Sequence, residues 1–271
     1  MNVQLALSAG KKFILKFLEA VKSEPQKKHE TRLQRAAQIH CAGHYKEWVK
    51  AFHKAIKPSA YLEIGVSNGG TLSLAYMHTR VVGVDPSPKI TCNLSAPTQL
   101  FKQGSDEFFE NYNMSKLTGE SADLSFVDGL HEFKQAYRDI RNAAQSSKDD
   151  ALILVHDVLP IDQKSATAER KTRHWPGDVY KALAFIYDNL PELEVTLIYA
   201  YPTGLAVVNG CGNLRSHHDL SKIALSLNEY QNLTVERYYA DYVPHFGQIH
   251  EASESIENSV SELVKVRNES A

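Results

Sequence analysis

A glycine-rich turn between two short apolar runs constrains the fold of this chain more than any other stretch. Residues 61–64 form an apolar run that stops at Gly65, and residues 81–84 form a second run that stops at Asp85. Apolar runs of this length are typical of parallel strands that are buried on both faces. Residues 71–77, between the turn and the second run, have helical spacing. The segment therefore predicts a strand, a tight turn, a helix and a second strand, the repeating unit of an α/β sheet.

The spacing of the glycines limits the ligand that such a turn can hold. A dinucleotide site uses G-x-G-x-x-G, whereas this chain has the wider spacing Glu63-x-Gly65-x-x-x-Gly69, with no phosphate-binding lysine after it. Asp85 ends the second strand about 20 residues after the first glycine, where such folds place the acid that binds ribose hydroxyls. Glycines alone are a weak signal, because any α/β turn can use them. Together with the two acids they indicate a nucleoside cofactor.

This stretch resembles the first motif of class I S-adenosylmethionine-dependent methyltransferases. The resemblance implies that S-adenosyl-L-methionine is the cofactor. The residues that it assigns to cofactor binding are Glu63, Gly65, Ser67, Gly69 and Asp85.

Later apolar runs extend the same α/β pattern. Residues 100–103 predict a short third strand, and residues 123–128 and 151–157 predict a fourth and a fifth. Residues 195–199 and 205–208 flank a short turn that contains Pro202 and Gly204, which requires an antiparallel pair. This hairpin resembles the closing strands of the class I methyltransferase sheet. The resemblance implies a Rossmann-like α/β fold with strand order 3-2-1-4-5-7-6 and an antiparallel last strand.

The two ends of the chain are expected to be helical extensions. Residues 13–21 and 33–56 have apolar residues at helical spacing, and the polar residues 23–30 between them, with Pro25, predict a linker. Four aromatic residues between 238 and 246 are expected in the core or an interface, and the tail from residue 251 is expected to be frayed or packed on a partner. The predicted division is therefore an N-terminal extension 1–58, a cofactor-binding domain 59–212 and a C-terminal extension 213–271. The terminal helices are also where a homo-oligomer would form.

Two acids follow the predicted fourth and fifth strands. Asp128 and Asp157 would lie on neighbouring strands in the implied order, and such strands are about 4.8 Å apart. A single aspartate at this position is often a helix cap, but two can bind one hard cation such as Mg²⁺.

Three further segments resemble a family of small-molecule O-methyltransferases related to those of cephalosporin biosynthesis and macrolide sugars, some of them metal-dependent. The segments are residues 126–140, 154–160 and 174–183. The resemblance implies a divalent cation, Mg²⁺ or Mn²⁺, held by Asp128, His156 and Asp157. His156 replaces the first acid of the usual pair, and Val158 replaces the asparagine of catechol-type enzymes. An imidazole ligand widens the choice toward Fe²⁺ or Zn²⁺.

The catalytic candidates follow from the need to deprotonate an acceptor hydroxyl. His131 and His156 can accept the proton, or a cation near Asp128 can lower the hydroxyl's pKa. Each histidine can equally be a residue that only hydrogen-bonds a loop. In this family the loop of Asp106 often lies beside the adenine, so Asp106 and Asp128 complete the expected cofactor site, although Ser105 or Asp106 can equally cap a helix. The 158–175 connection is expected to line the substrate end. His174 and Asp178 flank residues 175–177 at its end, where a substrate lid could be anchored, and Asp178 can equally be a helix N-cap.

The composition excludes several other classes. A formal net charge of −2 argues against broad nucleic-acid or membrane binding, and no apolar run has transmembrane length. Three widely spaced cysteines favour a reducing compartment, so a cytoplasmic protein is expected. The family resemblance implies that the acceptor is a small molecule. Two alternatives stay open: an NAD-linked oxidoreductase on a similar sheet, and a non-catalytic relative that only binds S-adenosylmethionine.

Overall fold

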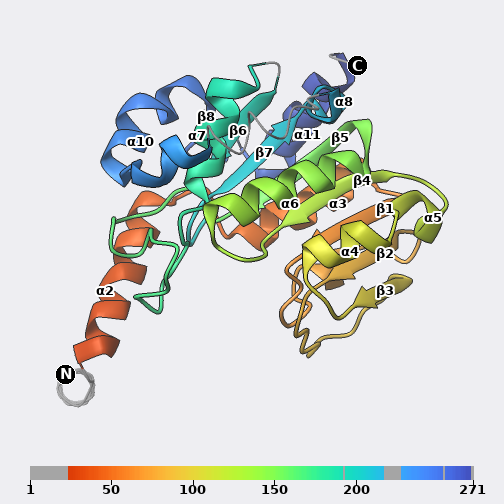
Figure 1. The fold of residues 1–271 in the computed structure, drawn as a ribbon, viewed down its shortest axis with the longest axis horizontal. Helices are drawn as coiled ribbons and strands as arrows, with labels where there is room; N and C mark the ends of the chain where they lie inside the picture. Colours follow the sequence, from red (N-terminus) through yellow and green to blue (C-terminus); the bar gives the residue numbers. More distant parts are fainter. Residues whose placement is uncertain (1–23, 192, 217–226, 253, 270–271) are drawn as a thin grey trace, which may run out of the picture.

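A single mixed sheet organises the molecule (Figure 1). The computed structural model describes residues 24–191, 193–216, 227–252 and 254–269. Eight strands lie in the order β3-β2-β1-β4-β5-β7-β6-β8. They are β1 (Ala60–Ile64), β2 (Arg80–Val84), β3 (Thr98–Phe101), β4 (Ala122–Val127), β5 (Ser147–His156), β6 (Glu194–Ile198), β7 (Leu205–Asn209) and β8 (Gly247–Ile249).

The strand directions confirm the predicted fold class. Strands β3, β2, β1, β4 and β5 are mutually parallel, and β7 runs antiparallel between β5 and β6. This is the order 3-2-1-4-5-7-6 with an antiparallel last strand. The short strand β8 was not predicted; it pairs parallel with β6 and extends the sheet by one strand. The division of the chain at residues 58 and 212 stays a prediction, and β8 shows that the C-terminal segment joins the same sheet.

The helices and 3-10 turns cover the sheet and its edges (Figure 1). They are α2 (Glu24–Ile39), α3 (Tyr45–Ile56), η1 (Leu72–Leu74), α4 (Ser105–Asn111), α5 (Met114–Thr118), α6 (Phe133–Gln145), α7 (Tyr180–Asn189), α8 (Cys211–Ser216), η2 (Leu227–Asn232), α10 (Val235–Asp241), η3 (Val243–His245) and α11 (Ile256–Glu269).

Helices α3 and α6 lie on opposite faces of the central strands. Side chains alternate between the two faces along a strand. On β4, Phe126 stacks against Tyr45 of α3 with ring centroids 6.3 Å apart. The preceding Ser125 bonds the hydroxyl of Ser147, which in turn donates to the carbonyl of Ala143 in α6. All residues of β1 and β4 are buried, as a sheet covered on both sides requires.

The N-terminal region differs from the prediction in two places. The expected linker at residues 23–30 is wrong, because α2 begins at Glu24. Pro25 lies in its first turn, where the missing N–H costs no helical hydrogen bond. The expected helix over 33–56 is two helices, since α2 ends at Ile39 and α3 begins after His44, whose side chain forms a capping box with Glu47. The helical face expected at residues 13–21 lies outside the described residues.

The predicted helix after the glycine turn is a single 3-10 turn, η1. Only nine residues, 71–79, separate the glycine pair from β2, and a helix this short has little stability of its own. In addition, the Thr71 hydroxyl bonds Glu63 and the Ser73 hydroxyl bonds the carbonyl of Gly70. Such local side-chain bonds compete with helix formation.

Two expected helix caps are also wrong. The N-cap of α4 is Gly104, and Ser105 and Asp106 are the first residues of the helix. The N-cap of α7 is Val179. The carboxylate of Asp178 instead accepts a 2.7 Å hydrogen bond from the backbone N–H of Phe133, at the start of α6. Asp178 thus ties the two helices together.

The C-terminal region packs onto the body of the molecule. In the aromatic group, Tyr238 is fully buried, and its ring lies 5.0 Å from that of Tyr180 on α7. The tail expected to be frayed or packed on a partner contains α11, which contacts α3 and buries Val260 completely.

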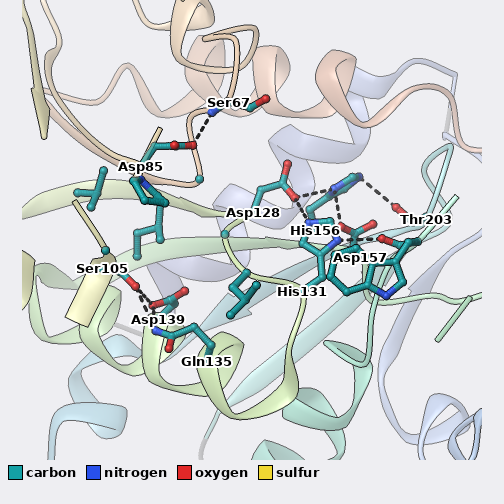
Figure 2. Close-up of a pocket in the computed structure, with 18 of the residues that line it drawn as sticks. Ser67, Asp85, Ser105, Asp128, His131, Gln135, Asp139, His156, Asp157 and Thr203 are labelled. Atoms are coloured by element: carbon teal, nitrogen blue, oxygen red, sulfur yellow. Dashed lines mark hydrogen bonds and ion pairs between the residues drawn. The ribbon is translucent and has the colours of Figure 1, made fainter. Parts of the chain in front are cut away.

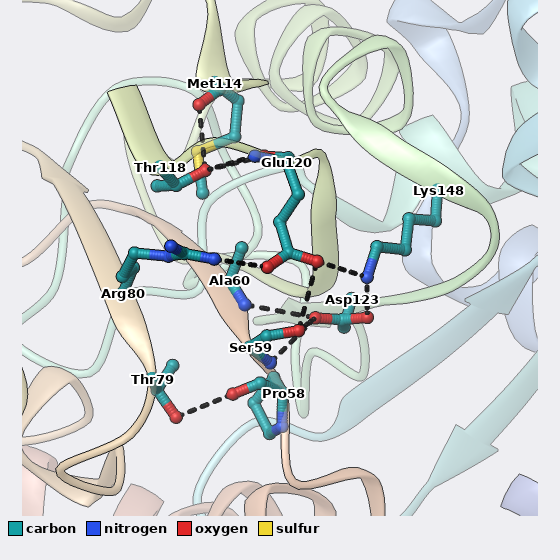
Figure 3. A network of polar contacts seen from close by, with 10 residues as sticks. All are labelled: Pro58, Ser59, Ala60, Thr79, Arg80, Met114, Thr118, Glu120, Asp123 and Lys148. Carbon is teal, nitrogen blue, oxygen red and sulfur yellow. Dashed lines mark hydrogen bonds and ion pairs between the residues drawn. The ribbon is translucent and has the colours of Figure 1, made fainter. Parts of the chain in front are cut away.

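A polar network fastens the amino ends of the central strands (Figure 3). The carboxylate of Asp123, at the start of β4, accepts hydrogen bonds from the backbone N–H groups of Ser59 and Ala60 at 2.8 and 3.0 Å. Lys148 of β5 donates to Asp123 at 2.6 Å and to Glu120 at 2.8 Å. The network therefore links β1, β4 and β5 at their amino ends, on the side of the sheet away from the strands' carboxyl ends.

Candidate active site

A cavity of about 760 Å³ opens at the carboxyl ends of β1, β2, β4 and β5. These are the strands at the point where the strand order reverses, which is where open α/β sheets bind ligands. Figure 2 shows its polar side chains in separate groups, with Asp85 and Ser67 apart from the cluster around Asp128 and Asp157. Of the residues predicted for the site, those lining the cavity are Gly65, Ser67, Asp85, Asp106, Asp128, His131, His156 and Asp157.

The glycine turn brings β1 against the loop after β4. Gly65 has φ +88, and its N–H donates to the carbonyl of Val84 at the end of β2. A Cβ on Gly65 would lie 1.9 Å from the backbone oxygen of Asp128. Only glycine permits both this conformation and this close approach. The turn thus fixes the distance between the ends of β1 and β4.

Among the described residues, only backbone N–H groups donate to Asp85. One of its oxygens accepts from the N–H of Ser67 and the other from the N–H of Ser87, both at 2.7 Å. Each carboxylate oxygen has a further lone pair. Asp85 is therefore oriented and still able to accept hydrogen bonds from a ligand in the cavity.

Glu63 and Gly69 do not line the cavity. Glu63 is fully buried and accepts hydrogen bonds from the hydroxyls of Tyr61 and Thr71, both at 2.7 Å. Burial raises the pKa of Glu63 to about 8, although these two bonds oppose the shift. Gly69 lies against Ile90 and Cys92. The structure thus gives Glu63 a place in the framework of the turn, and direct contact of either residue with a cofactor stays a prediction.

Beside Asp106, the structure places an acid that sequence reasoning missed. Asp139 of α6 is 1% exposed, lines the cavity, and accepts from the hydroxyl of Ser105 at 2.6 Å and the amide of Gln135 at 2.9 Å. Burial raises the pKa of Asp139 to about 6. Nothing in the sequence marked it, because an aspartate in the middle of an amphipathic helix is usually solvated.

Two aspartates and two histidines form the centre of the cavity (Figure 2). His131 Nε2 lies 3.1 Å from Asp157 Oδ2 and 3.5 Å from Asp128 Oδ1. His156 Nδ1 lies 3.1 Å from Asp128 Oδ1 and 3.5 Å from Asp157 Oδ2. We call these four residues the Asp–His cluster. The predicted convergence of the two strand-ending acids is therefore present, and both histidines lie between them.

The cluster shifts the pKa of each member. Burial by itself would lower the pKa of His156 and His131, but the two carboxylates raise them to about 10 and about 9. Burial would raise the pKa of both carboxyls, but the imidazoles hold them below their usual range. Without a cation, the cluster therefore consists of paired imidazolium and carboxylate groups at neutral pH.

Further residues hold the two imidazole rings in place. His131 Nδ1 lies 2.9 Å from the carbonyl of Trp175, and the two rings stack with centroids 5.1 Å apart. His156 Nε2 lies 3.3 Å from the hydroxyl of Thr203, and Tyr45 covers its ring at 4.0 Å. Trp175, Thr203 and Tyr45 were not among the predicted site residues. They come from distant segments, so only the folded chain could reveal them.

The cluster has a donor set that suits a divalent cation. Three residues each offer one ligand atom, and these atoms all lie within 4.8 Å of one another: Asp128, His131 and Asp157. Oδ2 of Asp157 is buried and accepts no well-aligned hydrogen bond from any described residue. Carboxylates with imidazole suit Mn²⁺, Fe²⁺ or Zn²⁺ as well as Mg²⁺. His131, expected only as a base, thus offers a ligand atom beside the predicted ligand His156.

The strand order and the position of the cavity define a class I methyltransferase fold. In sequence, residues 62–158 match the model of a family described as a methyltransferase domain. This segment, about a third of the chain, contains the glycine turn and the Asp–His cluster. It places the chain among methyltransferase enzymes. No curated protein matches the chain.

Several solved structures are distantly similar. A putative O-methyltransferase from Klebsiella pneumoniae is 12% identical, with TM-score 0.48 over 74% of this chain and 96% of that one. The O-methyltransferase from Bacillus cereus, in complex with SAH, is 16% identical, with TM-score 0.46 over 72% and 96%. TomG from Streptomyces achromogenes, in complex with SAM, is 13% identical, with TM-score 0.47 over 72% and 94%. These similarities are too distant to define an activity.

No helix in the described part of the chain combines the length and apolar character needed to cross a membrane.

Proposed function

We propose that this protein transfers a methyl group from S-adenosylmethionine to a hydroxyl of a small molecule, such as a sugar or a natural product. The observation that carries the proposal is one cavity with Asp85 and the glycine turn in one part and the Asp–His cluster in another. The match to a methyltransferase domain over the same residues supports it.

The donor would be held by the acidic part of the cavity. Asp85 has free lone pairs for ribose hydroxyls, and Asp106 and Asp139 line the wall beside it. Within the described part of the chain, Asp85 is paired only with backbone N–H groups, so its negative charge also favours a cationic ligand. S-adenosylmethionine, when bound, supplies an electrophilic methyl on a sulfonium.

The acceptor hydroxyl would lie at the Asp–His cluster, where its proton must be removed. His131 lines the cavity and its ring is held by Trp175, so its imidazolium can orient the acceptor hydroxyl through a hydrogen bond. It can accept the hydroxyl's proton only when it is itself neutral, because the neighbouring carboxylates raise its pKa to about 9. We further propose that Asp128 and Asp157, with His131 or His156, hold a divalent cation. Such a cation lowers the pKa of a bound hydroxyl.

Calorimetric titration tests the donor assignment. S-adenosylhomocysteine should bind the full chain and NAD should not. Asp85→Asn should weaken the binding of S-adenosylhomocysteine by about ten- to hundredfold, the range of charged hydrogen bonds. Asp241→Asn, which removes a surface ion pair with Arg237, is the matched control and should bind normally. Binding of NAD without binding of S-adenosylhomocysteine would support the oxidoreductase alternative and end the proposal.

Two expectations about cell biology remain proposals. The three cysteines are free thiols, which fits a reducing cytoplasm. A homo-oligomer through the terminal helices would bury surfaces of α2 or α11.

A further inference from the structure

The part of the cavity beyond the Asp–His cluster is built by segments outside the matched methyltransferase domain. His29 of α2 lines it, together with Arg173 and His174 at the end of the 158–175 connection. All three lie outside residues 62–158. We call these residues the basic end of the cavity. Because it is not part of the matched domain, it is a place where this chain can specify its own acceptor.

The basic end carries a positive charge that the neighbouring side chains do not neutralise. Arg32 pairs with Asp162 at 3.0 Å and Lys171 lies 3.8 Å from Glu169. Arg173, by contrast, is exposed, lines the cavity, and forms no ion pair with any residue the structure describes. The carboxylates of the Asp–His cluster already have imidazole partners. An uncompensated guanidinium in a cavity is complementary to an anion.

The two histidines beside Arg173 add unused hydrogen-bonding atoms. His174 is 6% exposed, and its Nε2 has no hydrogen-bond partner among the described residues. Nδ1 of His29 is also buried and has no partner in the described part of the chain. Burial and then the charge of Arg173 lower the pKa of His29. A neutral imidazole adds no charge, so the guanidinium of Arg173 is the charged group that this end offers to an anion.

We propose that the acceptor carries an anionic group, a carboxylate or a phosphate, which Arg173 binds while the acceptor hydroxyl lies at the Asp–His cluster. This inference rests on the proposed methyl transfer for the role of the hydroxyl. The binding of the anion itself needs only the basic end. The planar fork of arginine binds both carboxylate and phosphate through paired hydrogen bonds.

Three sugars that share one skeleton test the proposal: glucose, glucuronate and glucose 6-phosphate. The pair 4-hydroxybenzoate and 4-hydroxybenzamide repeats the comparison on an aromatic ring. Binding to the full chain is measured by calorimetry, with and without saturating S-adenosylhomocysteine. At least one anionic probe should bind about ten- to hundredfold more tightly than its neutral counterpart. A preference for glucuronate or for glucose 6-phosphate identifies the anion as a carboxylate or a phosphate.

Arg173→Gln should abolish this preference and leave the affinity for S-adenosylhomocysteine unchanged. Arg170→Gln is the matched control, because Arg170 is on the same connection but lies over the ring of Trp175, 5.7 Å from its centroid. The proposal is wrong if no probe pair shows a preference for the anion, or if Arg173→Gln keeps the preference. It is also wrong if Arg173→Gln weakens the binding of S-adenosylhomocysteine, because Arg173 would then bind the carboxylate of the donor. Failure of the wild type to bind S-adenosylhomocysteine would instead overturn the proposed function, and the donor-free titrations would still test the anion.

Discussion

The substitution Gly65→Ala should damage both the stability of the protein and its donor site. An added Cβ would lie 1.9 Å from the backbone oxygen of Asp128, 2.3 Å from its carbonyl carbon and 2.7 Å from the Cα of Gly129. All three are backbone atoms, so no rotamer change relieves the contacts. The first contact must lengthen by about 1 Å to reach 3.0 Å, the shortest distance that real Cβ atoms show.

The expected cost has two parts. Alanine in the left-handed conformation, at φ +88, costs about 1–2 kcal/mol. Overpacking against a rigid neighbour adds about 1–3 kcal/mol. A loss of roughly 2–5 kcal/mol is within the stability of an ordinary domain, so the variant should fold but unfold at a lower urea concentration. Separating Gly65 from Asp128 should also displace the turn that holds Asp85, so binding of S-adenosylhomocysteine should weaken at least about tenfold.

Gly104→Ala provides a matched control in the same cavity. A Cβ at Gly104 meets no atom within 4 Å, and its φ of −67 suits any residue. Alanine is a poorer N-cap than glycine, so a change of up to about 1 kcal/mol is expected there. The reasoning is refuted if urea unfolding and calorimetry show Gly65→Ala to be as stable and as competent for the donor as wild type. Equal damage from Gly104→Ala would refute it as well.

Three further predictions concern stability and the cation. Burial raises the folded pKa of Glu63 to about 8 from 4.5, so the folded state keeps a proton that the unfolded chain releases. The contribution of this proton to the free energy of unfolding is complete below pH 4.5 and is lost as the pH rises through 8, by up to about 1.4 kcal/mol per pH unit. Urea titrations of wild type and Glu63→Gln at several pH values measure this loss. Asp123→Ala should lower the free energy of unfolding by about 2–4 kcal/mol, because it leaves two backbone N–H groups and Lys148 without their acceptor. Calorimetric titration with Mn²⁺ should show one site, which Asp157→Asn weakens at least about tenfold.

Each of these has an outcome that contradicts it. The account of Glu63 is wrong if wild type and Glu63→Gln show the same dependence of stability on pH. Asp123→Asn keeps one acceptor oxygen and should cost less than Asp123→Ala, so equal losses would show that the hydrogen bonds are not the cause. Absence of a Mn²⁺ site, or wild-type affinity in Asp157→Asn, would remove the cation from the mechanism.

The sequence predicted the parts of this protein that depend on local pattern. Continuous apolar runs predicted the buried strands, because a parallel sheet covered on both faces has no polar side to alternate with. The apolar runs that end on Asp85, Asp128 and Asp157 predicted three acids at the carboxyl ends of the strands. In the structure all three acids line the cavity. Where short-range pattern was weak, the prediction failed: residues 71–77 form only a 3-10 turn, and residues 23–30 begin a helix.

The tertiary structure alone decided which side chains surround the acids. His131 lies against Asp157 because Trp175, 44 residues further along the chain, holds its ring. Asp139 lines the cavity from the middle of a helix, and Arg173 does so from the end of a long connection. A single sequence shows the period of each element but not which distant elements pack together. The acids at the strand ends could therefore be predicted from the sequence. Long-range packing decided which side chains shift the pKa values of the acids in the Asp–His cluster, and it also placed Arg173 in the same cavity.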